Sequence, residues 1–149
     1  MNIEYLHNWS PNLNQDMEIK IFGHAGKPAL VFPALSGRFF DFENFGMIHA
    51  VHEFIDRGEF QFFCVDSIDR QSWENYALHP ADRARRHEDY DRYITQEVMP
   101  LMHEKNGSER GILTTGASMG GYHAANFFFR HPDAFDAVIS LSGMFQLRP

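Results

Sequence analysis

The sequence predicts an α/β fold built on a doubly wound, mostly parallel β-sheet. Two short apolar segments, residues 29–32 and 60–65, have the composition of buried strands, and segments with a helical spacing of apolar residues lie between and after them. Strands that alternate with helices form parallel βαβ units. The chain has 149 residues, of which 44% are hydrophobic, so we expect residues 1–149 to form a single domain with a proper core.

The N-terminal part of the chain is expected to supply two strands. Residues 17–23 alternate apolar and polar side chains with a period of two, which is typical of a half-exposed strand, and turn-forming residues 10–14 precede them. Residues 29–32 are continuously apolar, as in a central strand that is covered on both faces, and Pro33 ends this strand. The pattern therefore predicts a half-exposed strand followed by a central one.

The middle of the chain predicts two helices around another strand. Residues 45–55 place apolar side chains at helical spacing, and Gly58 marks the end of this helix. The strand at residues 60–65 follows, and then a polar loop. Residues 82–105 form a long, charged amphipathic helix, which Pro100 is expected to kink or divide because proline lacks the backbone N–H.

The composition restricts the classes of function. The net charge is −7, which argues against a nucleic-acid-binding or anionic-membrane-binding surface. The single cysteine, Cys64, cannot form an internal disulfide and fits a reducing compartment. Residues 1–11 have neither the basic nor the apolar region of a secretory signal, and no apolar run approaches the roughly 18 residues of a membrane span. We therefore expect a cytoplasmic protein.

Residues 111–122 carry the most specific pattern in the chain. A short apolar strand runs into Gly116-Ala117-Ser118-Met119-Gly120 and directly on into a helix over residues 122–130. Gly-x-Ser-x-Gly between a strand and a helix is the pattern of the nucleophile elbow of an α/β-hydrolase, whose strained turn needs glycines on both sides of the serine. Ser118 is then the candidate nucleophile, and the Met119 backbone N–H is a candidate oxyanion donor. The alternative is a tight turn with an idle serine.

The loop after the central strand, residues 35–45, is the candidate for the second oxyanion donor. In an α/β-hydrolase this donor comes from the loop that precedes the first helix. Gly37 would let the backbone approach a ligand closely, and the N–H of the following residue could point inward. A simple polar turn is the alternative for this loop.

Several motifs together resemble the esterase D, or putative-esterase, family of α/β-hydrolases. They are Leu35-Ser36-Gly37, Asp41-x-Glu43-Asn44-Phe45, the long helix with Tyr90, Gly116-x-Ser118-Met119-Gly120-Gly121, and His131-Pro132-Asp133-x-Phe135 with Leu141-Ser142-Gly143. Relatives in this family include S-formylglutathione hydrolases, feruloyl esterases and mycolyltransferases. The resemblance extends from about Trp9 to Gly143, so it is more specific than the pentapeptide alone.

The resemblance implies an α/β-hydrolase fold, ester hydrolysis through an acyl-serine, and no metal or organic cofactor. By match to the family's loop, it assigns the second oxyanion N–H to Arg38, although the family often has a less bulky or less polar residue at this position. It also implies a partial domain that is truncated after residues 137–141, the strand that follows the elbow helix.

The acid and the histidine of a catalytic triad are not predicted in this chain. Their order in α/β-hydrolases is serine, acid, histidine, and the segment after Ser118 contains only the elbow helix and one strand. Without a base the Ser118 hydroxyl stays protonated and is a poor nucleophile. His123 is turned about 140° away from Ser118 around the helix, and no pattern gives a catalytic role to His79, His87 or His131. The 149-residue chain is therefore expected to be catalytically weak.

Three further features are expected to be structural. His49 and His52, with Glu53, have the helical spacing of a metal pair, but the sequence offers no third ligand. Cys64, inside an aromatic strand, is expected to be a small buried hydrophobic residue. The charged residues at the start of the long helix are expected to form a solvated face of mixed sign; they are Arg83, Arg85, Arg86, Glu88, Asp89 and Asp91.

The sequence thus predicts the N-terminal portion of a serine carboxylic-ester hydrolase that acts on a small-molecule ester. The alternative is a non-catalytic, hydrolase-like module for binding or oligomerisation. We also expect a homo-oligomer formed through residues 137–141, because an apolar strand with an unpaired edge invites pairing with a second copy.

Overall fold

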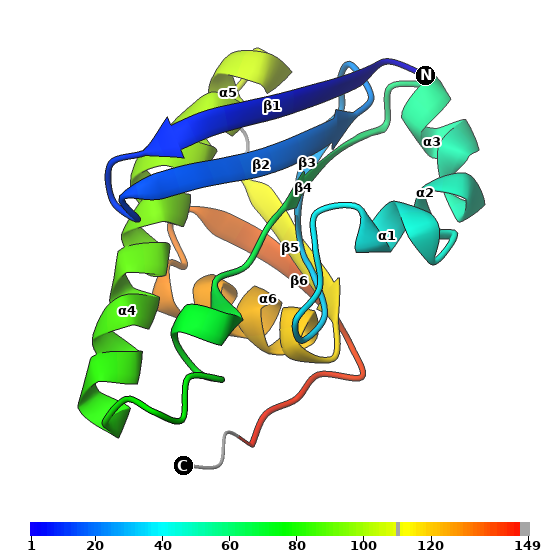
Figure 1. Ribbon diagram of the computed structural model, residues 1–149. Coiled ribbons are helices and arrows are strands. Elements are labelled where there is room, and N and C mark those ends of the chain that lie inside the picture. Colours follow the sequence, from blue (N-terminus) through cyan, green and yellow to red (C-terminus); the bar gives the residue numbers. More distant parts are fainter. Residues whose placement is uncertain (110, 147–149) are drawn as a thin grey trace.

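The computed structural model describes residues 1–109 and 111–146, which form a mixed six-stranded sheet with helices on both faces (Figure 1). The strands are β1 (Ile3–Ser10), β2 (Gln15–Phe22), β3 (Lys27–Phe32), β4 (Phe60–Val65), β5 (Ile112–Ala117) and β6 (Phe135–Leu141). Their order in the sheet is β1-β2-β4-β3-β5-β6. The last four strands in this order are parallel, whereas β1 and β2 are antiparallel to their neighbours. The predicted α/β fold with a mostly parallel sheet is therefore confirmed.

The helices divide between the two faces of the sheet. They are α1 (Asp41–Asn44), α2 (Met47–Ala50), α3 (His52–Asp56), α4 (Pro80–Tyr93), α5 (Met99–Asn106) and α6 (Met119–Arg130), with a 3-10 turn at Asp69–Gln71 and a π-helical segment at Ile94–Val98. Helices α4 to α6 contribute to the larger hydrophobic cluster, and α2 and α3 contribute to a separate cluster on the opposite face. None of the helices in the described ranges is long and apolar enough to cross a membrane.

Strand β1 is absent from the sequence prediction. Most of its side chains are exposed, including Ile3, Tyr5 and Trp9, so it lacks the alternation of buried and polar residues that marks a half-buried strand. It is defined by pairing with β2 through a tight turn at residues 11–14, where Asn14 has a φ of 56°. Turn chemistry and edge pairing determine this strand, and hydrophobic burial does not.

The helix expected over residues 45–55 is wrong as a continuous element. Gly46 has a φ of 85° and separates α1 from α2, and Val51 separates α2 from α3. A left-handed backbone conformation cannot continue a right-handed helix, and glycine adopts it without strain. The apolar spacing nevertheless indicates correctly which side chains are buried, because Ile48 and Ile55 lie in the hydrophobic cluster on this face.

The long helix runs from Pro80 to Asn106 with an irregular centre. The π-helical segment Ile94–Val98 ends two residues before Pro100, whose ring would clash with the carbonyl of the residue four positions earlier in a regular α-helix. The irregularity expected at Pro100 is therefore confirmed and is placed in the preceding turn.

The core fixes α6 against the centre of the sheet. The Thr114 hydroxyl on β5 donates to the Ala124 carbonyl on α6 over 2.8 Å, and the ring of Phe32 on β3 stacks on Phe127 with centroids 5.1 Å apart. Cys64 is buried on the opposite face, as predicted, and burial raises the pKa of its thiol. These contacts hold the middle of α6 against β3 and β5.

Candidate active site

Ser118 lies at the sharp turn between β5 and α6. Its φ of 57° and ψ of −117° are unusual for a residue with a side chain, and such backbone strain costs about 1–3 kcal/mol and concentrates at functional sites. The turn is held on both sides: the Ser118 N–H donates to the Leu141 carbonyl over 2.9 Å, and the Ser118 carbonyl accepts from the N–H of Met144 over 3.0 Å. The end of β6 therefore supports the strained residue.

The glycines around Ser118 are required by close backbone contacts. A Cβ on Gly116 would lie 2.7 Å from the Phe32 carbonyl oxygen, and a Cβ on Gly120 would lie 2.7 Å from the Pro33 carbonyl oxygen. Both distances are shorter than a side-chain carbon tolerates, so only glycine fits at either position. The same contacts bring the loop that follows β3 against the first turn of α6.

Met119 is the first residue of α6, and its side chain is buried. The N–H groups of the first helical turn have no acceptor within the helix, and they carry the positive end of the helix dipole. An amide at this position can therefore donate to an anion.

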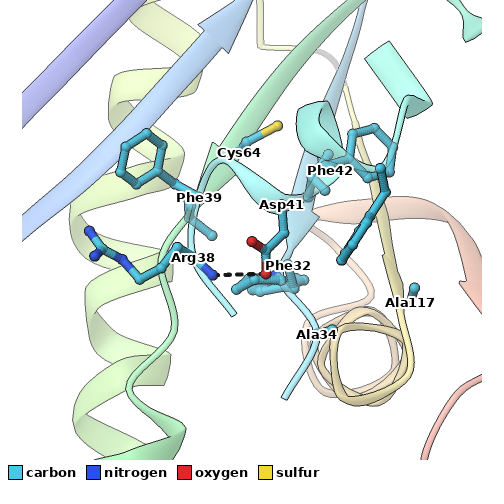
Figure 2. A pocket seen from close by; sticks show the side chains of 12 residues that line it. Phe32, Ala34, Arg38, Phe39, Asp41, Phe42, Cys64 and Ala117 are labelled. Carbon is cyan, nitrogen blue, oxygen red and sulfur yellow. Dashed lines mark hydrogen bonds between the residues drawn. The ribbon is translucent and has the colours of Figure 1, made fainter. Parts of the chain in front are cut away.

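The loop that contains Arg38 lies beside this turn. Arg38, Ala34 and Ala117, the residue before Ser118, line the same small cavity of about 30 Å³. The Arg38 N–H donates to Asp41 Oδ2 over 3.1 Å, as Figure 2 shows. A Cβ on Gly37 would collide with this same carboxylate and with the Ala34 carbonyl oxygen, so the loop needs glycine there. In the structure, Asp41 is the acceptor for the amide that was predicted as an oxyanion donor.

The Arg38 side chain extends away from the cavity (Figure 2). Its Nε donates to Asp66 Oδ1 over 3.0 Å, and its terminal nitrogen donates to Glu18 over 2.7 Å. Asp66 also accepts from the Phe39 N–H over 2.8 Å. The bond to Asp66 raises the pKa of Arg38, and burial raises the pKa of Asp66. The guanidinium thus ties the loop to β2 and to the end of β4, which explains an arginine at this position.

The histidines weighed from the sequence have other partners. His123 is buried and its Nε2 lies 2.8 Å from Asp69 Oδ1, so it faces away from Ser118, as helix geometry predicts. The remaining three are His79, which accepts from the Ala81 N–H, His87, whose Nε2 lies 3.3 Å from Asn126, and His131, which pairs with Asp91. Within the described ranges, no hydrogen bond links Ser118 to a histidine ring.

Two further groups of residues singled out in the sequence are the pair His49 and His52 and the charged face of α4. His49 and His52 stack with ring centroids 5.4 Å apart, and no third metal ligand joins them among the described residues. The solvated face expected at the start of α4 is wrong for Arg83 and Asp91, which are both buried. The reason is that α4 packs against other elements. Asp91 pairs with His131 at the end of α6, and His87 on α4 contacts the ring of Trp73 in the preceding loop.

Sequence reasoning missed two features of this region. Asp41 was part of a motif but had no assigned role, and its bond to the Arg38 N–H depends on the loop conformation. Arg83 was expected in solvent because a charged residue on an amphipathic helix is usually exposed. No local sequence signal distinguishes Arg83 from Arg85, which is exposed two positions later.

Comparisons with known proteins show which folds this chain resembles. The S-formylglutathione hydrolase FrmB from Staphylococcus aureus has a similar structure, with a TM-score of 0.71 and 20% identity, over 97% of this chain and 60% of that one. An S-formylglutathione hydrolase from Agrobacterium tumefaciens gives a TM-score of 0.70 and 14% identity over 91% and 56%. The ferric enterobactin esterase from Salmonella typhimurium gives 0.68 and 18% over 97% and 37%. At these identities the similarity shows the fold.

The chain spans about 60% of the length of the first of these structures. No curated protein sequence matches it significantly. The model of the family described as "Putative esterase" matches residues 10–149, which include the turn at Ser118, the loop at Arg38 and all of β2 to β6. The chain therefore belongs to the putative esterase family.

Proposed function

We propose that this chain carries the nucleophile and the oxyanion-binding part of a serine carboxylic-ester hydrolase of esterase D type. The observation that carries the proposal is the strained backbone of Ser118 at the junction of β5 and α6, with φ at 57°. A serine held in this way at the N-terminus of a helix has the geometry of a nucleophile elbow. The match to the putative esterase family supports the same assignment and a small-molecule ester as substrate.

The proposed chemistry follows from the atoms around Ser118. Its Oγ forms a bond to the acyl carbon while its proton passes to a general base, and the carbonyl oxygen becomes an oxyanion. The bond between the acyl carbon and the alcohol oxygen then breaks, and that oxygen takes up the proton as the alcohol leaves. Water then releases the acid from the acyl-serine. The N–H groups of Met119 and Arg38 are proposed to stabilise the oxyanion, a contribution worth about 3 kcal/mol for one donor. The Arg38 N–H is available only when the Asp41 carboxylate turns away from it.

The proton of the Ser118 hydroxyl needs a general base. The four candidate histidines have other partners: Asp69 for His123, Asn126 for His87, Asp91 for His131 and the Ala81 N–H for His79. None of them is therefore positioned to accept the proton of Ser118. We therefore propose that the 149-residue chain is a weak catalyst, whose residual activity comes from the oxyanion donors and from substrate binding.

Covalent labelling of Ser118 tests this proposal. The chain is incubated with a fluorophosphonate probe, and the modified residue is identified by mass spectrometry, alongside hydrolysis of p-nitrophenyl acetate. Slow labelling confined to Ser118 and lost in Ser118→Ala is the expected result. Ser142→Ala is the matched control, because Ser142 also follows a strand with a positive φ, of 49°, but does not begin a helix.

The outcomes separate the two candidate functions. Absence of labelling in a folded chain would contradict the proposal and favour a non-catalytic, hydrolase-like module. Rapid, Ser118-dependent turnover would contradict the expected weakness and would require a base from a second copy or from a histidine that changes its partner.

A further inference from the structure

Arg83 on α4 carries a buried guanidinium, and no described acidic residue forms an ion pair with it. Only 6% of the residue is exposed, and its Nε is enclosed without any hydrogen-bond acceptor among the described residues. Its neighbours on the helix behave differently, since Arg85 pairs with Asp82 and Arg86 pairs with Asp89. A buried charge is costly unless it is paired and hydrogen-bonded. The guanidinium of Arg83 is therefore expected to bind an acceptor that is absent from this structure's described residues.

Arg83 makes a cation–π contact with an aromatic ring. The guanidinium carbon lies 5.3 Å from the centroid of the Tyr76 ring. A cation–π contact of this kind satisfies none of the five N–H donors of the guanidinium. Within the described ranges Nε has no acceptor, and an anion that contacts the terminal nitrogens of Arg83 would supply the oxygen acceptors that this guanidinium lacks.

Arg83 lines a cavity of about 310 Å³ that Met119, the residue after the strained serine, also lines. The walls come from the loop after β3, the loop before α4, the start of α6 and the segment after β6; they include Leu35, Trp73, Glu74, Tyr76, Met119 and Met144. Met119 follows Ser118 directly, and the Met144 N–H donates to the Ser118 carbonyl. A small molecule in this cavity would thus lie beside the proposed nucleophile.

Glu74 is the one other charged residue among those that line this cavity. Its two carboxylate oxygens accept from the Ser36 hydroxyl over 2.9 and 3.1 Å, and it forms no ion pair with Arg83. The carboxylate is thereby tethered to the loop after β3. Its charge opposes an anion in the cavity, so an anionic group is favoured only where it can reach the guanidinium.

We propose that Arg83 is the recognition residue for a free carboxylate carried by the ester substrate. This inference rests on the proposed esterase function, because it names the substrate class of the same site. The planar guanidinium matches a carboxylate with two parallel hydrogen bonds, and burial strengthens them. The rings of Trp73 and Tyr76 supply apolar walls for the carbon chain between the carboxylate and the ester.

Two esters that differ only in charge test the proposal. Monomethyl succinate carries a free carboxylate, whereas dimethyl succinate replaces it with a neutral ester. Binding is measured in Ser118→Ala, which removes turnover, by the fluorescence of Trp73. The chain has 2 tryptophans, so Trp9→Phe, at an exposed position on β1, leaves Trp73 as the single reporter.

The expected result is that monomethyl succinate binds at least about tenfold more tightly than dimethyl succinate, as for a hydrogen-bonded charge pair. Arg83→Gln should abolish this preference, and Arg83→Lys should retain part of it. Arg85→Gln is the matched control, because Arg85 is exposed on the same helix and should leave the preference unchanged. Glu74→Gln removes the opposing charge and should tighten binding of monomethyl succinate alone.

Equal binding of the two esters would overturn the proposal, and so would equal losses in Arg83→Gln and Arg85→Gln. If Arg83→Gln does not fold, the Glu74→Gln variant tests the proposal instead. Unchanged binding of monomethyl succinate by Glu74→Gln would contradict an anion subsite. A charge preference without any labelling of Ser118 would retain the subsite and reject the esterase function. Labelling of Ser118 without a preference for the charged ester would retain the esterase function and reject the carboxylate subsite.

Discussion

The backbone N–H of Arg38 donates to the carboxylate of Asp41, so the candidate oxyanion donor already has an anionic acceptor. The carboxylate oxygen occupies the direction in which a substrate oxyanion would receive this hydrogen bond, and the like charges of the two would repel. Asp41 therefore competes with the transition state in the conformation that the structure describes.

Neutralising Asp41 should raise the reactivity of Ser118. In Asp41→Asn the shape of the side chain is kept and the repulsion between two anions is removed, so we expect several-fold faster labelling by a fluorophosphonate, where each 1.4 kcal/mol corresponds to about tenfold in rate. The measurement is the second-order rate constant of labelling. Glu43→Gln, in the same short helix, is the control. Slower labelling in Asp41→Asn would instead mean that the charge of Asp41 is needed to hold the loop in place.

Substitution of Gly120 by alanine should destabilise the protein even though alanine favours helices. In an ordinary helix interior, the change would stabilise by about 1 kcal/mol. Here the new Cβ would lie 2.7 Å from the Pro33 carbonyl oxygen and would also collide with the Phe32 carbonyl. We expect the free energy of unfolding in urea to fall by about 2 kcal/mol or more, with slower labelling of Ser118.

The reverse substitution in the same helix is the control for Gly120→Ala. Ala125→Gly changes helix propensity without a backbone clash, and it should cost about 1 kcal/mol. An increase in stability for Gly120→Ala would show that α6 can move away from the end of β3, which would contradict the tight packing of the turn at Ser118.

His87 should make the fold sensitive to acid. Burial lowers the pKa of His87 from 6.5 to about 3, and His123 and Arg130 add to this effect while Asp69 opposes it. The unfolded chain binds a proton here below about pH 6.5, and the folded chain does not until about pH 3. The free energy of unfolding should therefore fall as the pH is lowered through this window, by up to about 1.4 kcal/mol per pH unit.

A phenylalanine at position 87 tests the origin of this acid sensitivity. His87→Phe keeps an aromatic ring beside Trp73 and His123 but cannot titrate, so the dependence of stability on pH should become flatter between about pH 6.5 and pH 4. Urea unfolding at a series of pH values measures this dependence. His24→Phe, at an exposed position, is the control. Parallel curves for His87→Phe and the unmodified chain would contradict the assignment.

The sequence predicts the central elements of this fold more reliably than its edges. Strands β3 and β4 and the turn at Ser118 are determined by continuous apolar runs and by glycines, which are local signals. The exposed strand β1 depends on pairing with β2, and the break at Gly46 depends on a backbone conformation. These features arise from tertiary context, so apolar periodicity does not reveal them.

The candidate site follows the same division. The turn at Ser118 and Met119 is predictable because Gly-x-Ser-x-Gly is a contiguous motif with a physical reason for each glycine. The bond from Arg38 to Asp41 and the burial of Arg83 join segments whose relation depends on the folded loops. A charged residue such as Arg83 carries the sequence pattern of a surface residue, so only its packing identifies it as a candidate for binding.

Self-association through β6 is the last prediction. Among the described strands, β6 pairs with β5 alone, so its outer edge presents unpaired backbone groups. Its face opposite α6 is apolar: Ile139 is 50% exposed, and Ile139, Leu141, Leu113 and Phe54 line an apolar groove of about 280 Å³. A second copy that pairs with β6 would satisfy the edge and cover part of this groove, and twofold pairing is the commonest closed arrangement.

A single charge on this strand should weaken the dimer. Placing a lysine in an apolar interface costs on the order of 1–3 kcal/mol, so Ile139→Lys should raise the dissociation constant by about tenfold or more. Light scattering across a wide concentration range measures the association. Phe129→Lys is the matched control, because Phe129 is an exposed apolar residue on α6, away from the β6 edge. A stable monomer at high concentration, or equal weakening by both substitutions, would contradict pairing through β6.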